Sequence, residues 1–233
     1  MSRFDRVIIK LSGEALSGEG SVFNAQLADD TARTLVEAAR EHQVGVVIGA
    51  GNIWRGRQGR DMDAVTADQM GMLGTVINCL YMADAVRRAG GRARVMSAIA
   101  MPRVCEEFTA INAIRALTDG EIVFFAGGSG NPFFTTDTAV VLRAAETKAD
   151  VILLAKNIDG VYTADPRVDK TATLIRDISY EEAARRQLKV MDTAAFTLCA
   201  EQHIPLVRVF GLTDPTSILR VLEGDDMGTV LHP

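Results

Sequence analysis

Residues 121–148 read EIVFFAGGSGNPFFTTDTAVVLRAAETK, and this stretch contains the repeating unit of the fold. The segment Glu121–Ala126, which is apolar without interruption after Glu121, predicts a strand that is buried on both faces. A glycine-rich loop follows. From Thr135 to Lys148 the apolar residues recur at three-to-four spacing, which predicts a helix, and Thr135, Thr136 and Asp137 can cap its start. A buried strand, a loop and a helix in this order are typical of a parallel sheet covered by helices.

The same unit recurs along the chain. Further strands are predicted at Arg6–Leu11, Val44–Ile48, Ala93–Ser97, Asp150–Ala155 and Leu206–Phe210. Further helices are predicted at Ala25–His42, Thr66–Arg88 and Thr193–His203, the second of them ended by Gly90 and Gly91. The fold class is therefore α/β with a mostly parallel sheet. We expect one domain over residues 1–233, with a soft division into two lobes near residue 150, and a hairpin or flap over 157–180.

Composition narrows the function classes. The chain has 233 residues, is 48% hydrophobic and carries a formal charge of −5, which disfavours sequence-blind binding to nucleic acid. Its first residues lack the features of a signal peptide, and no run of eighteen apolar residues predicts a membrane span. Cys79, Cys105 and Cys199 are widely spaced and form no CxxC motif. Free thiols in a reducing cytoplasm are the favoured interpretation over a metal site or a disulfide framework.

Cationic residues gather where predicted strands end. Lys10 ends the first strand and is followed by Ser12 and Gly13, whose amides can approach a phosphate, although a lysine that emerges into solvent is an equal alternative. The segment GAGNIWRG, residues 49–56, places two glycines and Arg55 after the second strand, which favours anion binding. Lys156 ends a third strand. Two lysines and an arginine at strand ends of an acidic protein indicate one shared anionic ligand, and because GxxxxGK[ST] is absent this is not a P-loop.

The loop GGSGNPFFTTD, residues 127–137, favours a different ligand group. Asp137 at the start of the helix would repel a phosphate, whereas neutral donors and the flat Phe133 and Phe134 suit an uncharged planar group such as a nucleobase. A turn with two core phenylalanines is the alternative. Asp68 lies in the first turn of the second helix, where it either caps the helix, which the sequence alone favours, or receives ribose hydroxyls.

No residue beside these loops is suited to act as a general base. His42, His203 and His232 lie near helix or chain ends, and the chain has neither a Ser-His-Asp set nor HExxH. A phosphate acceptor needs no such base, since a phosphomonoester loses its second proton near pH ~6. Such a reaction needs mainly positive charge, Mg²⁺ and alignment of the reactants.

Six ordered motifs resemble those of the bacterial uridylate (UMP) kinases of the amino-acid kinase superfamily. They are KLSGEAL from Lys10, GxGNIxRG from Gly49, ADxMGMLxTVIN from Ala67, GNPFFTTD from Gly130, DGVYTADP from Asp159 and KVMDTAAF from Lys189. The resemblance spans essentially the whole chain. It implies a three-layer α/β/α sandwich that transfers the γ-phosphoryl group of ATP to UMP in pyrimidine biosynthesis. It also implies a cytoplasmic homohexamer that responds to GTP and UTP as allosteric effectors.

The resemblance also implies residue roles. Lys10, Arg55 and Asp192 are expected to be catalytic, and the role implied for Asp192 is to organise the active centre. The ATP-binding residues are expected to be Lys10, Leu11, Ser12, Gly13, Gly51, Arg55, Lys156, Tyr162 and Asp165. The UMP-binding residues are expected to be Ala50, Asp68, Ser129, Gly130, Asn131, Pro132, Phe133, Phe134, Thr135 and Thr136. The phosphates of ATP, rather than a cluster of side chains, are expected to hold Mg²⁺.

Four positions depart from the family pattern, and two alternative functions stay open. Ala50 stands for a usual glycine, so its methyl group must fit beside the UMP phosphate, and Trp54 replaces a usual Phe, which predicts a change in packing or subunit contact. Ser129 stands for a common Thr, and the order Lys156-Asn157 differs from the usual Thr-Lys. One alternative is another superfamily kinase that phosphorylates acetylglutamate or aspartate. The other is a non-enzymatic nucleotide sensor or anion-storage shell.

Overall fold

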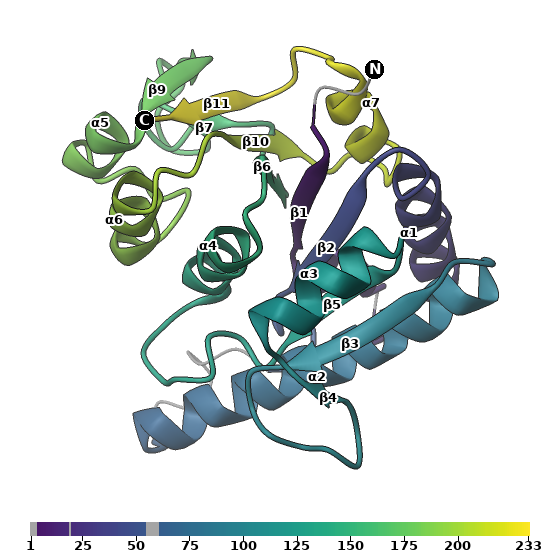
Figure 1. Cartoon of the computed structure of the whole chain (residues 1–233). Coiled ribbons are helices and arrows are strands. Elements are labelled where there is room, and N and C mark those ends of the chain that lie inside the picture. The colour runs from purple at the N-terminus through teal and green to yellow at the C-terminus, as the bar shows by residue number, and fades with distance from the viewer. Residues whose placement is uncertain (1–3, 19, 55–60) are drawn as a thin grey trace.

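The computed structural model describes residues 4–18, 20–54 and 61–233, and its central feature is one large sheet (Figure 1). Within these residues the sheet has nine strands in the order β4-β3-β5-β2-β1-β6-β10-β11-β9. The strands are β1 (Arg6–Leu11), β2 (Gln43–Ile48), β3 (Ala93–Ser97), β4 (Glu106–Glu107), β5 (Ile122–Ala126), β6 (Val151–Lys156), β9 (Asp177–Ser179), β10 (Val207–Gly211) and β11 (Thr229–His232). Neighbouring strands are parallel except β10 and β11, which are antiparallel.

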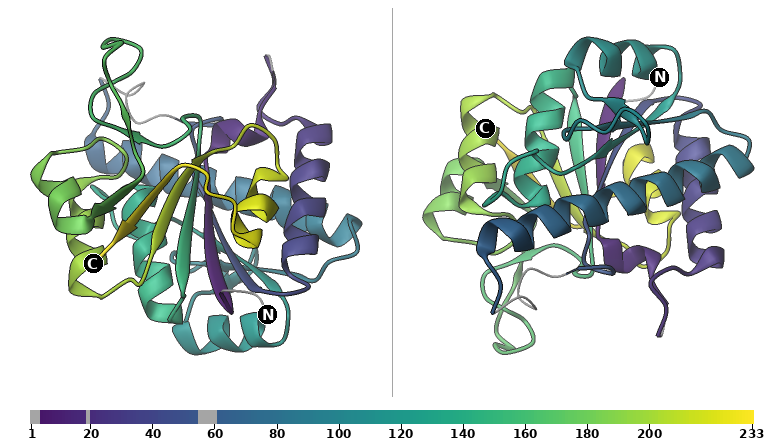
Figure 2. Two further views of the ribbon diagram at one scale, coloured as in Figure 1. Left: turned by 90° about the horizontal axis from the view of Figure 1, so that it is seen from above. Right: turned by 90° about the horizontal axis from the view of Figure 1, so that it is seen from below.

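Helices cover both faces of the sheet (Figure 2). One hydrophobic core joins one face of the sheet to α1 (Ala25–Ala38), α2 (Ala64–Arg88) and α7 (Ser217–Glu223). A second core joins the other face to α3 (Ala110–Thr118), α4 (Thr136–Thr147), α5 (Tyr180–Arg185) and α6 (Thr193–Glu201). Alternate residues of β1 feed the two cores, Val7 and Ile9 one of them and Ile8 the other. This alternation explains why the three consecutive residues Val7–Ile9 are all apolar, and the arrangement is the expected three-layer α/β/α sandwich.

The predicted elements are all present, with shifts at their ends. β1 and β3 have the predicted bounds, and α2 ends at Arg88 before Gly90, which has a φ of +87°. Thr135 is the N-cap of α4, as predicted. The first helix ends at Ala38 rather than at His42, because the chain turns there to enter β2, where Gln43 donates to the carbonyl of Asp5.

Several short elements were not predicted: α3, α5, α7, β4, β9 and β11. The segment 157–180 contains a two-stranded antiparallel hairpin, β7 (Val161–Tyr162) and β8 (Leu174–Ile175), as expected. The predicted division near residue 150 falls between α4 and β6. β1 pairs with β2 on the same side of this division and with β6 across it. The division into lobes stays a prediction. Among the described residues, the helices are too short or too polar to cross a bilayer.

The strand order brings four loops to one edge of the sheet. β1 lies between β2 and β6, and β5 lies on the far side of β2, all of them parallel. Their carboxyl ends therefore meet at the same edge. The chain passes from β1 to β2 on one side and later returns from β5 through α4 to β6 on the other side of β1, so the direction of strand order reverses at β1. In open α/β sheets, ligands bind at such a reversal of strand order.

Candidate active site

A buried triad of charged side chains lies at this edge. Lys10 at the end of β1 and Lys156 at the end of β6 both contact Asp137 in the first turn of α4. The Lys10 Nζ lies 3.1 Å from Asp137 Oδ1, and the Lys156 Nζ lies 3.3 Å from Asp137 Oδ2. The three side chains are 12–19% exposed. Two cations and one anion leave one positive charge at a partly desolvated position, which favours binding of an anion.

The pKa values follow from this mutual contact. Burial acts to raise the pKa of Asp137, but Lys10 and then Lys156 hold that pKa below its usual value. Burial lowers the pKa of Lys156; Asp137 opposes that shift, and the charge of Lys10 adds to it. Asp137 therefore carries a negative charge that allows two lysines to lie side by side. Lys156 also donates to the carbonyl of Val190.

The loops after β1 and β2 are in direct contact. Ser12 caps the short 3₁₀ helix Gly13–Leu16 by accepting from the Glu14 amide. A Cβ on Gly13 would lie 2.4 Å from both Asn52 Oδ1 and the carbonyl oxygen of Gly49. Only glycine fits at this close approach, so the sequence at residue 13 allows the two predicted anion loops to pack together.

A cavity of about 300 Å³ opens beside the triad. Its walls come from the start of α2, from the loop after β2 and from residues 128–136. Of the predicted UMP-binding residues, it is lined by Ala50, Asp68, Phe134, Thr135 and Thr136. Asp137 directly follows Thr136, so the triad and the cavity wall are continuous in the chain.

Other predicted UMP residues form the outer part of the loop. Ser129 donates to the carbonyl of Asn131 and accepts from its amide at 3.1 Å, which makes a tight turn that leads into Pro132. Gly130 has a φ of +83°, and Phe133 has a φ of +69° and is 71% exposed. Phe134 is 51% exposed. The alternative of two core phenylalanines is therefore wrong.

Asp68 does not cap α2. The N-cap is Asp63, which accepts from the amide of Thr66 at 2.9 Å. Asp68 accepts instead from the backbone amide of Phe133 at 2.6 Å, across the cavity mouth. The capping interpretation is thus wrong, and the carboxylate faces the cavity with one bond to the loop 127–136.

The two departures at residues 50 and 54 are accommodated by α2. A Cβ on Gly74 would lie 2.9 Å from the Ala50 Cβ, so the methyl group of Ala50 has room because residue 74 is glycine. The Trp54 indole donates from Nε1 to the carbonyl of Ala67 at 2.9 Å. Its ring lies against Gly71. Trp54 therefore packs against α2, as expected if its replacement of the usual Phe changes the packing.

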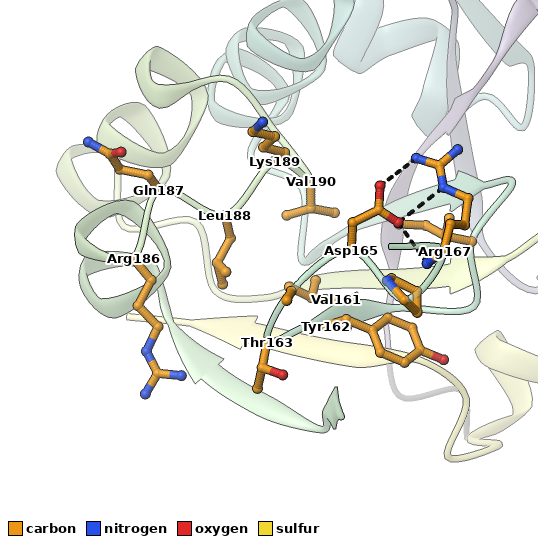
Figure 3. Close-up of a pocket in the computed structure, with 13 residues that line it drawn as sticks. Val161, Tyr162, Thr163, Asp165, Arg167, Arg186, Gln187, Leu188, Lys189 and Val190 are labelled. Carbon is orange, nitrogen blue, oxygen red and sulfur yellow. Dashed lines mark hydrogen bonds and ion pairs between the residues drawn. The ribbon is translucent and has the colours of Figure 1, made fainter. Parts of the chain in front are cut away.

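A second cavity has a volume of about 390 Å³ (Figure 3). The hairpin region from Ile158 to Arg167 and the segment Arg186–Val190 line it. Both Tyr162 and Asp165, predicted for ATP, lie in its wall. Lys156 reaches this wall through its hydrogen bond to Val190.

In this second cavity, the side chains of both predicted ATP ligands, Asp165 and Tyr162, form hydrogen bonds with residues close to them in the chain. Asp165 accepts from Arg167 through Nε at 3.0 Å, Nη2 at 2.9 Å and the backbone amide at 3.0 Å. These hydrogen bonds lower the pKa of Asp165 to about 2. The Tyr162 hydroxyl donates to Asp159 at 2.9 Å. The wall is polar and charged where it meets solvent, and apolar at Val161 and Val190.

Asp192 joins two helices beside the triad. It caps α6 by accepting from the Ala195 amide at 2.7 Å, and it accepts from the Thr138 hydroxyl at 2.9 Å and from the Thr135 hydroxyl. These contacts hold the start of α4, which carries Asp137. The geometry gives Asp192 an organising position, and its catalytic role stays a prediction.

The remaining predicted residues are placed as follows. Arg55 lies outside the described residues. The side chain of Leu11 is fully buried in the core, so only its backbone faces the edge. Gly51 lies beside Glu14, 3.6 Å from its Cγ when a Cβ is built. Sequence reasoning missed the bridging role of Asp137, although an acidic first-turn residue in a protein with two strand-end lysines was a usable signal.

Over residues 4–18, 20–54 and 61–233, no three His, Cys, Asp or Glu side chains come together as a group that could hold a metal ion. The three histidines lie away from this edge: His42 in the turn before β2, His203 after α6 and His232 in β11.

Comparisons with known proteins agree with this geometry. The family model described as "Amino acid kinase family" matches residues 5–209. The crystal structure of a UMP kinase from Ureaplasma parvum is 35% identical, covers 99% of this chain and 100% of its own, and has a TM-score of 0.93. A UMP kinase from Bacillus anthracis is 37% identical, with 98% and 96% coverage and a TM-score of 0.93. A uridylate kinase from Archaeoglobus fulgidus is 25% identical, with 99% and 100% coverage and a TM-score of 0.75.

Proposed function

The chain belongs to the amino acid kinase family, and we propose from this premise that it is a UMP kinase, which transfers the γ-phosphoryl group of ATP to UMP. One observation of geometry carries the proposal. Each cavity is linked to the triad Lys10–Asp137–Lys156 by one wall residue: Thr136, in the smaller cavity, directly precedes Asp137, and Val190, in the larger cavity, accepts a hydrogen bond from Lys156. A cationic centre linked to two pockets suits the two phosphate groups that meet in phosphoryl transfer.

The smaller cavity suits UMP. Asp68 can accept a ribose hydroxyl, the hydroxyls of Thr135 and Thr136 can bond the edge of a base, and Phe134 offers a flat apolar face. The exposed Phe133 and the turn Ser129–Pro132 close over this side. The larger cavity suits ATP, and Tyr162 and Asp165 stay its predicted ligands.

The reaction needs no general base. At neutral pH the 5′-phosphate of UMP has lost its second proton, and one of its oxygens forms a bond to the γ-phosphorus of ATP. The bond from that phosphorus to the β–γ bridging oxygen breaks, and its electron pair leaves with ADP; the other product is UDP. Lys10 and Lys156 neutralise the negative charge that gathers on the phosphates, and Asp137 keeps the two ammonium groups in place. Arg55 is proposed to hold the phosphates from the loop after β2.

Mg²⁺ is proposed to enter with ATP as part of the substrate. Mg²⁺ prefers oxygen ligands and is commonly held by nucleotide phosphates with few protein groups. The ion would supply further positive charge between the β- and γ-phosphates.

Assembly and regulation are proposed from the resemblance, with support from one surface. Met70, Leu73, Ile77 and Leu80 form an apolar stripe on α2, and each side chain is 37–49% exposed. A stripe of this kind is typical of a subunit contact, as a homohexamer requires. The response to GTP and UTP, the place in pyrimidine biosynthesis and the cytoplasmic location stay predictions.

A coupled assay of ADP release tests the function. UMP, CMP, acetylglutamate and aspartate are each supplied with ATP and Mg²⁺, and we expect UMP to give by far the highest kcat/KM. Release with acetylglutamate or aspartate alone would identify another kinase of the superfamily. Release with none of the four would favour a nucleotide sensor or storage shell, and either result would overturn the proposal.

A further inference from the structure

Asn78 is a buried polar side chain that the reaction described above does not use. It lies in the middle of α2 and is fully buried, in a stretch where Val76, Cys79 and Met82 pack into the core. A carboxamide in such surroundings costs free energy unless its donors and acceptor are bonded. The hydrogen-bond partners of Asn78 therefore show which part of the structure it holds in place.

Within the described residues, the side-chain hydrogen bonds of Asn78 all go to one loop, residues 49–52. Its Nδ2 donates to the carbonyl of Gly49 at 2.7 Å and to Asn52 Oδ1 at 2.8 Å. Its Oδ1 accepts from Asn52 Nδ2 at 3.0 Å, so the two carboxamides form a reciprocal pair. Asn52 Nδ2 also donates to the carbonyl of Val22 at 3.0 Å.

This loop lies between the two nucleotide sides. On one side, Asn52 Oδ1 and the Gly49 carbonyl are the atoms packed closest against Gly13 of the phosphate loop after β1. On the other side, Ala50 lines the cavity proposed for UMP. The two atoms that contact Gly13 are the same two that Asn78 Nδ2 bonds.

The helix that carries Asn78 also contacts the acceptor loop. Thr75, one turn earlier and buried, accepts from the Gly127 amide at 2.9 Å, and Asp68 accepts from the Phe133 amide. One rigid helix thus holds the loop after β5 at one point and the loop after β2 at another. A shift of the loop 49–52 relative to α2 would change the distance between the two bound phosphates.

We propose that Asn78 is a positioning residue for phosphoryl transfer. Resting on the proposed function, the inference is that its carboxamide fixes Gly49 and Asn52 against Gly13, and so sets the alignment of the UMP phosphate with the γ-phosphate of ATP. Misplacement of reacting groups by about 1 Å costs about a hundredfold in rate. The effect therefore falls on kcat more than on either KM.

The first test compares Asn78→Leu with Cys79→Ala. Leucine has a similar size and no hydrogen-bonding group, whereas Cys79 is the next residue, equally buried, and points to the carbonyl of Phe125 rather than to the loop. We expect N78L to lower kcat by about a hundredfold and to raise the KM of ATP and UMP by less than about threefold. We expect C79A to lower the melting temperature without a comparable loss of kcat. Equal kcat in N78L and wild type, or a loss that C79A reproduces at the same melting temperature, would overturn the inference.

The second test approaches the pair from the loop side and does not depend on the core. Asn52→Ala removes the partner at a half-buried position, and the double variant N52A/N78L completes a cycle. Because the two side chains act as one unit, the double variant should lose about as much kcat as the worse single variant. Losses that multiply would show independent roles and overturn the inference.

Fluorescence provides a measurement that does not need turnover. Trp54 is the single tryptophan of the chain, and its amide donates to the carbonyl of Ala50 at 2.8 Å, so its ring follows the loop. The emission of the nucleotide-free protein should shift in N78L and N52A and stay unchanged in C79A. Unchanged emission in all three would overturn the positioning role. Absence of UMP phosphorylation by the wild-type protein would instead count against the proposed function alone.

Discussion

The two cavities beside the triad are built by contacts of different range. Around the smaller cavity, the Asp68–Phe133 and Thr75–Gly127 hydrogen bonds join residues that are 65 and 52 positions apart. Around the larger cavity, the Asp165–Arg167 and Tyr162–Asp159 hydrogen bonds join residues two and three positions apart. The polar side chains of the first cavity are thus held by contacts with distant parts of the chain, whereas Asp165 and Tyr162 in the second are held by near neighbours. The backbone of the hairpin is itself joined to β11, where the Val161 amide donates to the Thr229 hydroxyl at 2.8 Å.

From this difference we expect the smaller cavity to be selective for its ligand and the larger cavity to adapt its shape. A cavity whose polar groups are fixed by long-range bonds presents a preorganised set of donors and acceptors, which is what discrimination among similar acceptors requires. Polar side chains that are held by near neighbours can change conformation at small cost to the rest of the fold. We therefore expect substitutions on the UMP side to alter stability and affinity together, and substitutions on the ATP side to alter affinity alone.

The largest effect should come from breaking the element that both cavities share. Asp137→Asn removes the negative charge between Lys10 and Lys156, so two partly buried ammonium groups then repel each other. We expect kcat to fall by about 10²–10³-fold, the usual cost of disrupting preorganised electrostatic stabilisation. Steady-state kinetics with UMP measures the effect. Asp30→Asn, at an exposed position of α1, is the control, and a kcat for D137N within about threefold of that control would contradict the role of the triad.

The next effect should be confined to the smaller cavity. Asp68→Asn keeps the size of the side chain but removes the charge that accepts the Phe133 amide and is proposed to accept ribose hydroxyls. Hydrogen bonds to charged groups contribute about 1.5–3 kcal/mol, so we expect the KM of UMP to rise about tenfold or more while the KM of ATP changes little. Asp63→Asn is the matched control, because asparagine also caps a helix well. A larger rise for ATP than for UMP would assign Asp68 to the other side.

Thr75→Val tests whether the smaller cavity and the fold are coupled. Valine has nearly the shape of threonine but cannot accept from the Gly127 amide, which would be left buried and unpaired. Such a loss costs about 1–3 kcal/mol, so we expect urea unfolding at a lower midpoint, together with a few-fold rise in the KM of UMP. Loss of stability without any change in KM would show that the loop 127–136 does not depend on α2 for its shape.

The smallest effect concerns the edge of the sheet on the ATP side. A hydrogen bond to the Pro233 carbonyl and one to Asp177 raise the pKa of His232. A raised pKa in the folded state means that the stabilisation is full below the unfolded value of about 6.5 and is lost as the pH rises through the folded value.

His232→Gln should remove that pH dependence. Below pH ~6 we expect the free energy of unfolding of the wild-type protein to exceed that of H232Q by less than about 1 kcal/mol, since the ion pair is exposed. At higher pH this difference between the two proteins should vanish. Thermal unfolding from pH 5 to pH 8 measures it. A change in the KM of UMP in this variant would contradict the separation of the two sides.

Prediction from sequence succeeded where the signal is local and repeated. The continuous apolar runs and the three-to-four spacing located the major strands and helices, because a strand between two helical layers has to be apolar on both faces. Sequence analysis did not predict the short elements α3, α5, α7, β4, β9 and β11, since segments of two to nine residues carry too little periodicity. The end of α1 was misplaced by four residues because a tertiary contact, Gln43 to Asp5, starts the next strand.

For the site, the sequence determined which residue types stand at strand ends, and it therefore predicted that an anion and a planar polar group bind at one edge of a parallel sheet. Tertiary structure alone decided how these residues pair: that Asp137 separates Lys10 from Lys156, that Asp68 bonds the Phe133 amide and not the end of its own helix, and that Asn78 holds Asn52. The physical reason is range. Backbone preference and hydrophobic period act between near neighbours in the chain, whereas charge pairing and buried hydrogen bonds depend on distances that exist only after the layers have packed.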